Sequence, residues 1–264
     1  MTSHDRGSVP TGTQPEEPRS SSSKPAKTHH LPLWQETILL LAVALVLAVV
    51  IKALFLQAFY IPSESMEPGL VKDDRILVQK VSYWGGGEPQ RGDVVVFKDP
   101  GGWLPSQEAA GPTATLPKLM TKIGLYPAGG HLVKRVIGVA GDTIECCDDQ
   151  GRILVNGKPL DGDLYVKVDE GIACDGPMVN QCGTDWTAGP VPEGHIFVMG
   201  DNRGHSADSS QKMCKPKVET ECVPGREFVP VDLVVGKVFV LLWPRQRFDV
   251  ITRPGTFEDV PDAS

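Results

Sequence analysis

The chain has 264 residues, more than one small domain requires, and its 33 acidic residues outnumber its 26 basic residues. This negative balance argues against nucleic acid as a partner. Glycine and proline are frequent, with 28 and 23 residues, and helical periodicity is poor after residue 70. We therefore expect short strands and many turns over most of the chain.

The N-terminal part combines a polar tail with one long apolar segment. We predict a disordered cytoplasmic tail over residues 1–35 and a transmembrane helix over residues 36–58, since roughly 20 apolar residues cross a bilayer. Arg19, Lys24 and Lys27 precede the helix, which predicts a single-pass protein of the plasma membrane with its N-terminus in the cytoplasm. A cleaved signal peptide is disfavoured, because the apolar run is long and no clear Ala-x-Ala site follows.

A short loop with two hydroxyl side chains follows the apolar segment. Ser63 and Ser65 are bracketed by Pro62 and Pro68, which fix φ and disfavour helix on either side. Taken alone, the loop is compatible with an ordinary turn next to the membrane. A nucleophilic serine is the alternative, and that interpretation depends on residues further along the chain.

Segments rich in β-branched residues predict a mainly β fold after the loop. Expected strands are 75–81, 94–97, 131–139, 152–155, 164–168, 196–199 and 233–243. We assign residues 59–142 and 196–250 to a β core, residues 143–195 to a small inserted β appendage, and residues 251–264 to a polar C-terminal tail. Within the core, residues 99–130 carry many Gly and Pro and predict a long, mobile surface insertion.

The strand predicted over 131–139 carries two charges among apolar residues. Lys134 shares one face with Leu132 and Val136, and Arg135 lies on the opposite face. Arginine stays charged in proteins, whereas burial can make lysine neutral, and a neutral amine can take the proton of a serine hydroxyl. The competing interpretation is that both side chains extend to solvent, and this strand alone leaves the two alternatives even.

Strand 196–199 leads into a polar, turn-forming cluster over residues 200–209. Functional loops are often placed at such positions, although Gly-Asp-Asn alone is more often a plain turn. His205 lies in this cluster, and it is the alternative to Lys134 as a base for Ser65.

All six cysteines follow the apolar segment, which indicates an oxidising exterior, with reduced thiols as the alternative. We predict local disulfides between Cys174 and Cys182 and between Cys214 and Cys222. Cys146 and Cys147 stay unassigned. Zinc is weakly supported because no Cys-x-x-Cys or His-x-x-x-His spacing accompanies the cysteines, so we expect neither a metal nor a cofactor.

Four motifs occur in order after the apolar segment, at residues 61–68, 91–94, 134–142 and 200–209. Together they resemble the bacterial type I signal peptidases, the membrane-bound serine proteases that remove signal peptides from exported proteins. The resemblance implies a mainly antiparallel β core, with a smaller β domain inserted between the motif at 134–142 and the motif at 200–209. The insert at 143–195 is short for that domain.

The resemblance also implies roles for individual residues. Ser65 would be the nucleophile and Lys134 its general base. Ser63 would help the backbone N–H of Ser65 to form an oxyanion hole, and Ser206 would orient the lysine amine.

Three further residues would form structural ion pairs near the site by the same resemblance, namely Arg135, Asp201 and Asp208. Many family members have Arg where this chain has Ser210, which puts the partner of Asp208 in doubt.

We therefore expect a Ser–Lys endopeptidase that cleaves signal peptides from exported preproteins at the outer face of the membrane. Its partners would be those signal peptides and the lipid bilayer. The alternative is a non-catalytic, membrane-anchored extracytoplasmic β-domain, in which Ser65 and Lys134 are structural.

Overall fold

The computed structural model describes residues 32–105, 129–167, 185–214 and 222–263. The chain divides into two compact units, Met1–Ala44 and Leu45–Ser264, and helix α1 (Leu33–Phe55) begins in the first and ends in the second. Within α1, Leu33–Ile51 is long and apolar enough to span a membrane, with a mean hydropathy of 2.3. An N-terminal apolar helix of this kind fits a membrane-anchored protein.

Helix α1 begins and ends earlier than the predicted range of 36–58. Its C-terminal limit is set by strand β1 (Leu56–Tyr60), which pairs antiparallel with β2 (Arg75–Gln79). The last residues assigned to the helix thus form backbone hydrogen bonds to a neighbouring strand instead. Local hydrophobicity does not reveal this limit, because the apolar run continues across the junction.

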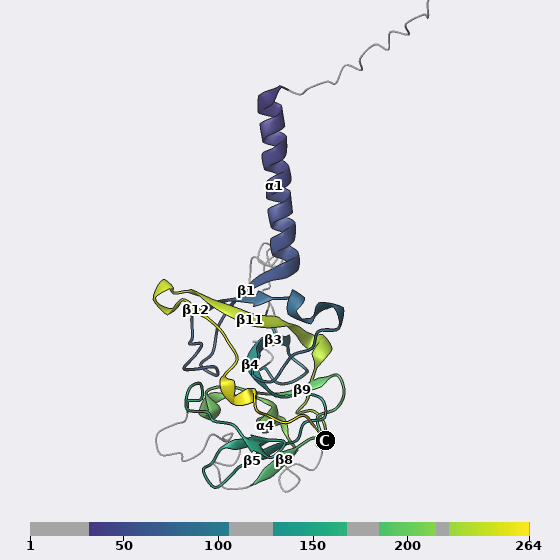
Figure 1. The fold of residues 1–264 in the computed structure, drawn as a ribbon, viewed down its shortest axis with the longest axis vertical. Coiled ribbons are helices and arrows are strands. Elements are labelled where there is room, and N and C mark those ends of the chain that lie inside the picture. Colours follow the sequence, from purple (N-terminus) through teal and green to yellow (C-terminus); the bar gives the residue numbers. More distant parts are fainter. Residues whose placement is uncertain (1–31, 106–128, 168–184, 215–221, 264) are drawn as a thin grey trace, which may run out of the picture. The chain divides into compact units, whose positions relative to one another are not determined.

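The second unit contains two antiparallel sheets, so the prediction of a mainly β, antiparallel fold is confirmed (Figure 1). The larger sheet has the order β1-β2-β11-β3-β4-β9-β10, and β12 pairs with β11. Its other strands are β3 (Val94–Lys98), β4 (His131–Gly138), β9 (His195–Met199), β10 (Val229–Pro230), β11 (Val234–Trp243) and β12 (Asp249–Val250). The smaller sheet has the order β7-β6-β5-β8, with β5 (Ile144–Cys146), β6 (Ile153–Val155), β7 (Lys158–Pro159) and β8 (Trp186–Ala188).

Short helical turns connect these strands. They are η1 (Val81–Gly86), η2 (Arg203–His205), α4 (Ser209–Lys212), η3 (Val231–Leu233), η4 (Arg245–Arg247) and η5 (Gly255–Phe257). The strand predicted over 164–168 is wrong: residues 163–165 form a turn, and Lys167 makes an isolated bridge to Asn202. Most of the predicted insertion at 99–130 lies outside the described residues.

Strand β3 is buried on both of its faces. Val94 and Val96 belong to one hydrophobic cluster, whereas Val95 and Phe97 belong to another on the opposite face. The first cluster also contains Ile61 and Met66, which flank the serine loop and are 2% and 1% exposed. Burial of these two side chains anchors the loop to the core of the larger sheet.

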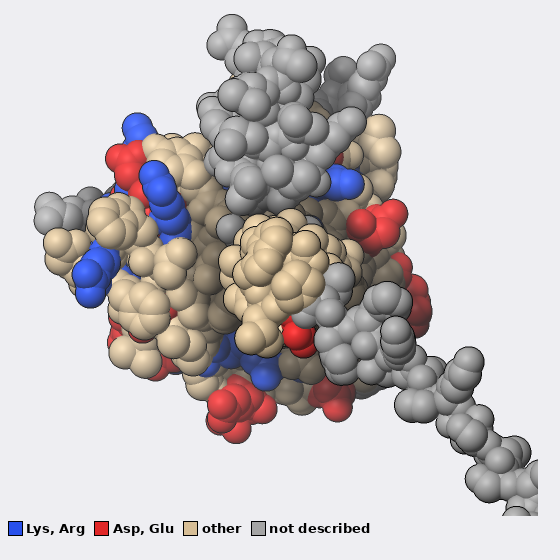
Figure 2. All heavy atoms as spheres, turned by 90° about the horizontal axis from the view of Figure 1, so that it is seen from above, with Lys and Arg blue, Asp and Glu red and all other residues tan. Residues whose placement is uncertain are grey.

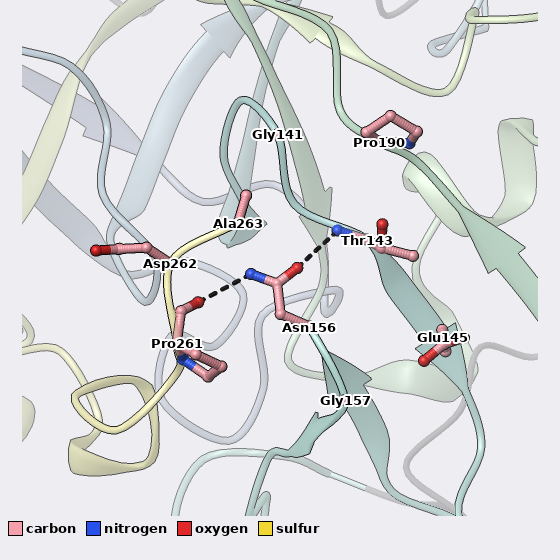
Figure 3. Close-up of a pocket in the computed structure, with 9 residues that line it drawn as sticks. All are labelled: Gly141, Thr143, Glu145, Asn156, Gly157, Pro190, Pro261, Asp262 and Ala263. Atoms are coloured by element: carbon pink, nitrogen blue, oxygen red, sulfur yellow. Dashed lines mark hydrogen bonds between the residues drawn. The ribbon is translucent and has the colours of Figure 1, made fainter.

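A third cluster joins the smaller sheet to the rest of the unit, and the end of the chain contributes to it. Phe257 and Val260 are buried there beside Ile144 of β5. The Asn156 side-chain amide also donates to the Pro261 carbonyl at 2.9 Å (Figure 3). The segment from residue 251, predicted as a polar tail, is thus attached to the smaller sheet by these contacts.

Cys214 and Cys222 form a disulfide, which confirms the predicted local bridge. Cys146 and Cys147, left unassigned by the sequence, are bonded to each other. The predicted Cys174–Cys182 bridge lies outside the described residues.

Candidate active site

The loop that carries Ser65 is fixed at both ends by backbone hydrogen bonds. The Ile61 N–H donates to the Asp74 carbonyl at 2.9 Å, and the Asp73 N–H donates to the Ile61 carbonyl at 2.9 Å. The Tyr60 hydroxyl donates to the Asp73 carboxylate. Ser65 is consequently held in one place and is only 6% exposed.

Lys134 reaches Ser65 from the middle of strand β4. Its Nζ lies 2.7 Å from Ser65 Oγ and 3.0 Å from the Val133 carbonyl oxygen. The lysine side chain is buried, and β4 is paired on both sides, with β3 and with β9. The amine therefore has a fixed approach to the serine hydroxyl.

Burial lowers the pKa of Lys134 to about 8, because removal from water penalises the ammonium form. The carboxylates of Asp208 and Asp201 favour the ammonium and oppose part of that effect. A free lysine has a pKa of ~10.4 and is almost fully protonated near neutrality. At a pKa of about 8, a substantial fraction is neutral at mildly alkaline pH and can accept the Ser65 proton.

The Ser63 hydroxyl lies beside the Ser65 hydroxyl. Ser63 Oγ is 3.3 Å from Ser65 Oγ, and the Ser63 side chain is exposed. No described residue accepts a hydrogen bond from the Ser65 N–H. A hydroxyl and an N–H next to a nucleophile are donors suited to an oxygen that becomes negative during acyl transfer.

Asp208 is surrounded by neutral donors. Its carboxylate accepts from Ser206 Oγ at 2.6 Å, the Gly200 N–H at 2.9 Å and Ser210 Oγ at 2.5 Å. Ser210, the residue that put the partner of Asp208 in doubt, thus supplies a hydroxyl to the same carboxylate. The described contacts of Lys134 Nζ do not include Ser206, whose hydroxyl donates to Asp208.

Gly200 lets the polar loop approach the serine loop closely. A Cβ at this position would overlap both the Ser65 carbonyl oxygen and Ser206 Oγ. Glycine is therefore required here by space, whatever its backbone conformation.

Arg135 and Asp201 form a buried, two-pronged ion pair. Arg135 Nε donates to Oδ1 at 2.8 Å and Nη2 donates to Oδ2 at 2.6 Å. Nη1 donates to the Gly92 carbonyl at 2.8 Å, and the guanidinium lies 4.7 Å from the centre of the Tyr165 ring. This pair ties β4 to the loop that follows β9.

The three histidines beyond the helix face other groups. His205 Nδ1 lies 3.1 Å from Glu64 Oε1, and both side chains are about half exposed. His131 Nδ1 and His195 Nδ1 lie near the carbonyls of Gly129 and Glu193. No contact with Ser65 is described for any of the three.

Two residues at the site have no role assigned in the sequence-based interpretation. Asn202 is fully buried, and it donates from Nδ2 to the Glu64 carbonyl and from its N–H to the Ser65 carbonyl, both at 3.1 Å. Lys167 Nζ pairs with Glu67 Oε2 at 2.7 Å. The Gly-Asp-Asn motif pointed to Asn202, but no pattern in the sequence marks Lys167.

Metal binding has no support in the described part of the chain, where no cluster of three potential ligands occurs. A pocket of about 500 Å³ lies between the smaller sheet and the C-terminal segment. Its lining includes Glu145, Asn156 and Asp262 but neither Ser65 nor Lys134, so it is separate from the candidate site (Figure 3).

Comparison with known proteins gives a consistent result. Residues 34–243 match the family described as signal peptidase, peptidase S26. A signal peptidase I of Mycobacterium tuberculosis is 37% identical over 261 residues, covering 92% of this chain and 85% of the relative. One from Leptolyngbya laminosa is 30% identical over 247 residues, covering 93% and 95%. The crystal structure of a signal peptidase I from Enterococcus faecalis is 22% identical and covers 57% of this chain and 96% of its own, with a TM-score of 0.28 that is too low to add to the argument.

Proposed function

Since the chain belongs to the signal peptidases of peptidase family S26, we propose that its active site is a dyad of Ser65 and Lys134. Membership makes the chain a serine endopeptidase that cleaves signal peptides from preproteins. The observation that supports the dyad is the 2.7 Å contact between Lys134 Nζ and Ser65 Oγ inside a buried site.

The proposed reaction proceeds by acyl transfer. Neutral Lys134 takes the proton of Ser65 Oγ as that oxygen bonds to the scissile carbonyl carbon. The resulting oxyanion accepts hydrogen bonds from the Ser65 N–H and the Ser63 hydroxyl. Lys134 then gives its proton to the leaving amine, the C–N bond breaks, and the signal peptide stays esterified to Ser65.

Water then hydrolyses the ester and releases the signal peptide from Ser65. Lys134 takes a proton from the water as its oxygen attacks the ester carbonyl, and it returns the proton to Ser65 Oγ as the ester bond breaks. We assign Ser206 to orientation of the lysine amine. The Ser206 hydroxyl donates its proton to Asp208, so in this role its oxygen would accept a hydrogen bond from the lysine amine.

Arg135, Asp201 and Asp208 have structural roles in this proposal. The first two hold strand β4 against the loop after β9, and Asp208 holds Ser206 and Gly200. The alternative, a β-domain without catalysis, requires Ser65 and Lys134 to be structural residues only.

Preprotein cleavage in detergent separates the two functions. Ser65→Ala should abolish cleavage, and Lys134→Arg, which keeps the charge but cannot deprotonate, should reduce turnover at least ~10³-fold with the fold retained. Lys98→Arg, the same change at an exposed strand position, is the matched control and should cleave normally. A folded Ser65→Ala or Lys134→Arg protein that cleaves at the wild-type rate would remove the proposal.

Orientation in the membrane is the next part of the proposal. The basic residues Arg19, Lys24 and Lys27 favour a cytoplasmic N-terminus, with the catalytic unit outside. In sealed inverted vesicles, added protease should trim the N-terminal tail and spare the β unit. Digestion of the β unit under those conditions would reverse the assignment.

Contact of the β unit with lipid is supported by its exposed aromatic residues. Trp84, Trp243 and Phe248 are 53%, 52% and 59% exposed, and the Trp84 ring lies 5.7 Å from that of Phe55 at the end of α1. Much of the face in Figure 2 is uncharged. Brominated lipid should quench a variant that keeps Trp243 alone and not one that keeps the buried Trp103 alone; equal quenching would contradict the contact.

A further inference from the structure

Asn202 binds both carbonyl groups that flank the Ser65 nitrogen along the chain. Its Nδ2 donates to the Glu64 carbonyl, and its backbone N–H donates to the Ser65 carbonyl, each at 3.1 Å. The side chain is 0% exposed. Asn202 is thus attached to the nucleophile's main chain, whereas Lys134 is attached to its side chain.

This attachment determines where the Ser65 N–H points. The Glu64–Ser65 peptide is trans, so the Glu64 C=O and the Ser65 N–H lie in one plane and point in opposite directions. Because the carbonyl is directed at Asn202, the N–H is directed away from Asn202. Rotation of this plane would turn the N–H out of position, and the hydrogen bond to Asn202 Nδ2 resists that rotation.

The amide orientation of Asn202 follows from its neighbour. If Oδ1 stood in the place of Nδ2, two acceptors would face each other at the Glu64 carbonyl. Oδ1 is buried and has no hydrogen-bond partner among the described residues. A buried polar atom without a partner lowers stability, so stability alone does not explain an asparagine here.

The loop that carries Asn202 is itself braced. The Lys167 N–H donates to the Asp201 carbonyl at 2.8 Å, and the Arg203 N–H donates to the Lys167 carbonyl at 3.2 Å. Lys167 Nζ also pairs with Glu67 at 2.7 Å. The serine loop and the asparagine loop are therefore held to a common third segment, which keeps Asn202 from moving with the peptide that it binds.

We propose that Asn202 is a positioning residue for the transition state, which fixes the Ser65 peptide plane so that its N–H meets the developing oxyanion. The inference rests on the proposed role of Ser65 and extends it to a residue that touches no reacting atom. An interaction that aligns an oxyanion donor contributes more to the transition state than to the bound substrate.

Two substitutions test this role. Asn202→Asp keeps the shape but places an acceptor against the Glu64 carbonyl, and Asn202→Leu removes the donor without adding charge. Both should lower kcat roughly tenfold to a hundredfold, somewhat less than loss of an oxyanion donor itself, with KM within about threefold of wild type. The pH dependence assigned to Lys134 should stay where it is in Asn202→Leu, which adds no charge near the amine.

A pair of ligands separates positioning from general structural damage. A peptide aldehyde that forms a tetrahedral adduct with Ser65 should bind more weakly by the same factor as the loss in kcat. The matching cleaved peptide, which forms no oxyanion, should bind to the variants as it does to wild type. Equal weakening of both ligands, or unchanged kcat, would overturn the proposal.

The matched control is Asn156→Asp. Asn156 Nδ2 also donates to a backbone carbonyl, that of Pro261, and has no described contact with Ser65 or Lys134 (Figure 3). This variant should lower Tm and leave kcat unchanged. Ser65→Ala, assayed in parallel, distinguishes failure of the dyad from failure of the positioning role. Residual cleavage by Ser65→Ala would refute the dyad. An inactive Ser65→Ala together with a fully active Asn202→Asp would refute only the positioning role.

Discussion

Lys134 and Arg135 are consecutive residues on strand β4 with nearly equal burial, 4% and 5% exposed, yet their electrostatic surroundings differ. Arg135 has both oxygens of Asp201 within hydrogen-bond distance, so its charge is neutralised. Lys134 Nζ meets a hydroxyl and a carbonyl, and burial lowers its pKa to about 8. Burial therefore lowers the pKa of the cation on one face of the strand, whereas on the other face a carboxylate holds the cation in an ion pair.

The choice of cation fits each face. Arginine does not lose its proton in proteins, and its planar donors suit the two oxygens of a carboxylate. Lysine loses its proton readily when desolvated, provided that no carboxylate lies in direct contact. Side chains of adjacent strand residues point to opposite faces, which lets one strand hold both arrangements.

The largest effect is expected where the buried ion pair is broken. Asp201→Asn leaves the Arg135 guanidinium buried without a counter-charge, and removal of one partner of such a pair costs about 3–5 kcal/mol. Urea unfolding should show this loss in the free energy of unfolding. The control is Asp249→Asn, at an exposed carboxylate, which should change stability by less than about 0.5 kcal/mol. Equal stability of the two variants would mean that Asp201 does not neutralise Arg135.

The opposite result is expected on the other face of the strand. A pKa of about 8 for Lys134, against ~10.4 in the unfolded chain, corresponds to about 3 kcal/mol against the buried ammonium. Lys134→Met has a similar length without the charge, so it should raise the free energy of unfolding at pH 7 by up to that amount while it abolishes cleavage.

The sign of this effect is tested by its pH dependence. Below pH 8 the ammonium is present in both the folded and unfolded wild-type protein, and the advantage of Lys134→Met is complete. From about pH 8 to 10.4 the folded lysine is neutral and the unfolded one is charged, so wild-type stability rises and the advantage disappears. An advantage that grows over this range would contradict the lowered pKa.

Much of the fold could be predicted from the sequence, because the hydrophobic pattern determines it. The apolar pattern of residues 131–139 predicted the strand that forms β4, and of the two alternatives for Lys134 and Arg135 the structure has the buried one. The four motifs resemble one family with a single active site, so Ser65 and residues 200–209 were expected to lie near one another. Both predictions depend only on which residues follow one another along the chain, which periodicity and motifs record.

Other features depend on tertiary contacts that leave no local pattern. The end of α1 is set by pairing of Leu56–Tyr60 with β2, and the C-terminal segment is fixed by burial of Phe257 and Val260. The two hydrogen bonds from Asn202 to backbone carbonyls require that residues 200–206 form a turn next to the serine loop. Side-chain composition cannot predict a contact made to the main chain of a distant residue.

A smaller change is expected from Asp208. Its carboxylate favours the Lys134 ammonium. Asp208→Asn should therefore lower the Lys134 pKa further and move the limb over which kcat/KM rises with pH to lower pH. Asp249→Asn again serves as the control and should leave the limb unmoved. A limb displaced to higher pH would show that the carboxylate acts on Lys134 in the opposite sense.

The smallest effect is expected from His205. A base must lie within hydrogen-bond reach of the proton that it removes, and His205 Nδ1 instead lies 3.1 Å from Glu64 Oε1 in a half-exposed pair. Exposed pairs of this kind contribute little, so His205→Ala should keep kcat/KM within about threefold of wild type at every pH. The pH profile adds a second test, since the limb near the Lys134 pKa of about 8 should be the same in His205→Ala and in wild type. Loss of cleavage in a folded His205→Ala protein would transfer the role of base from β4 to the loop after β9.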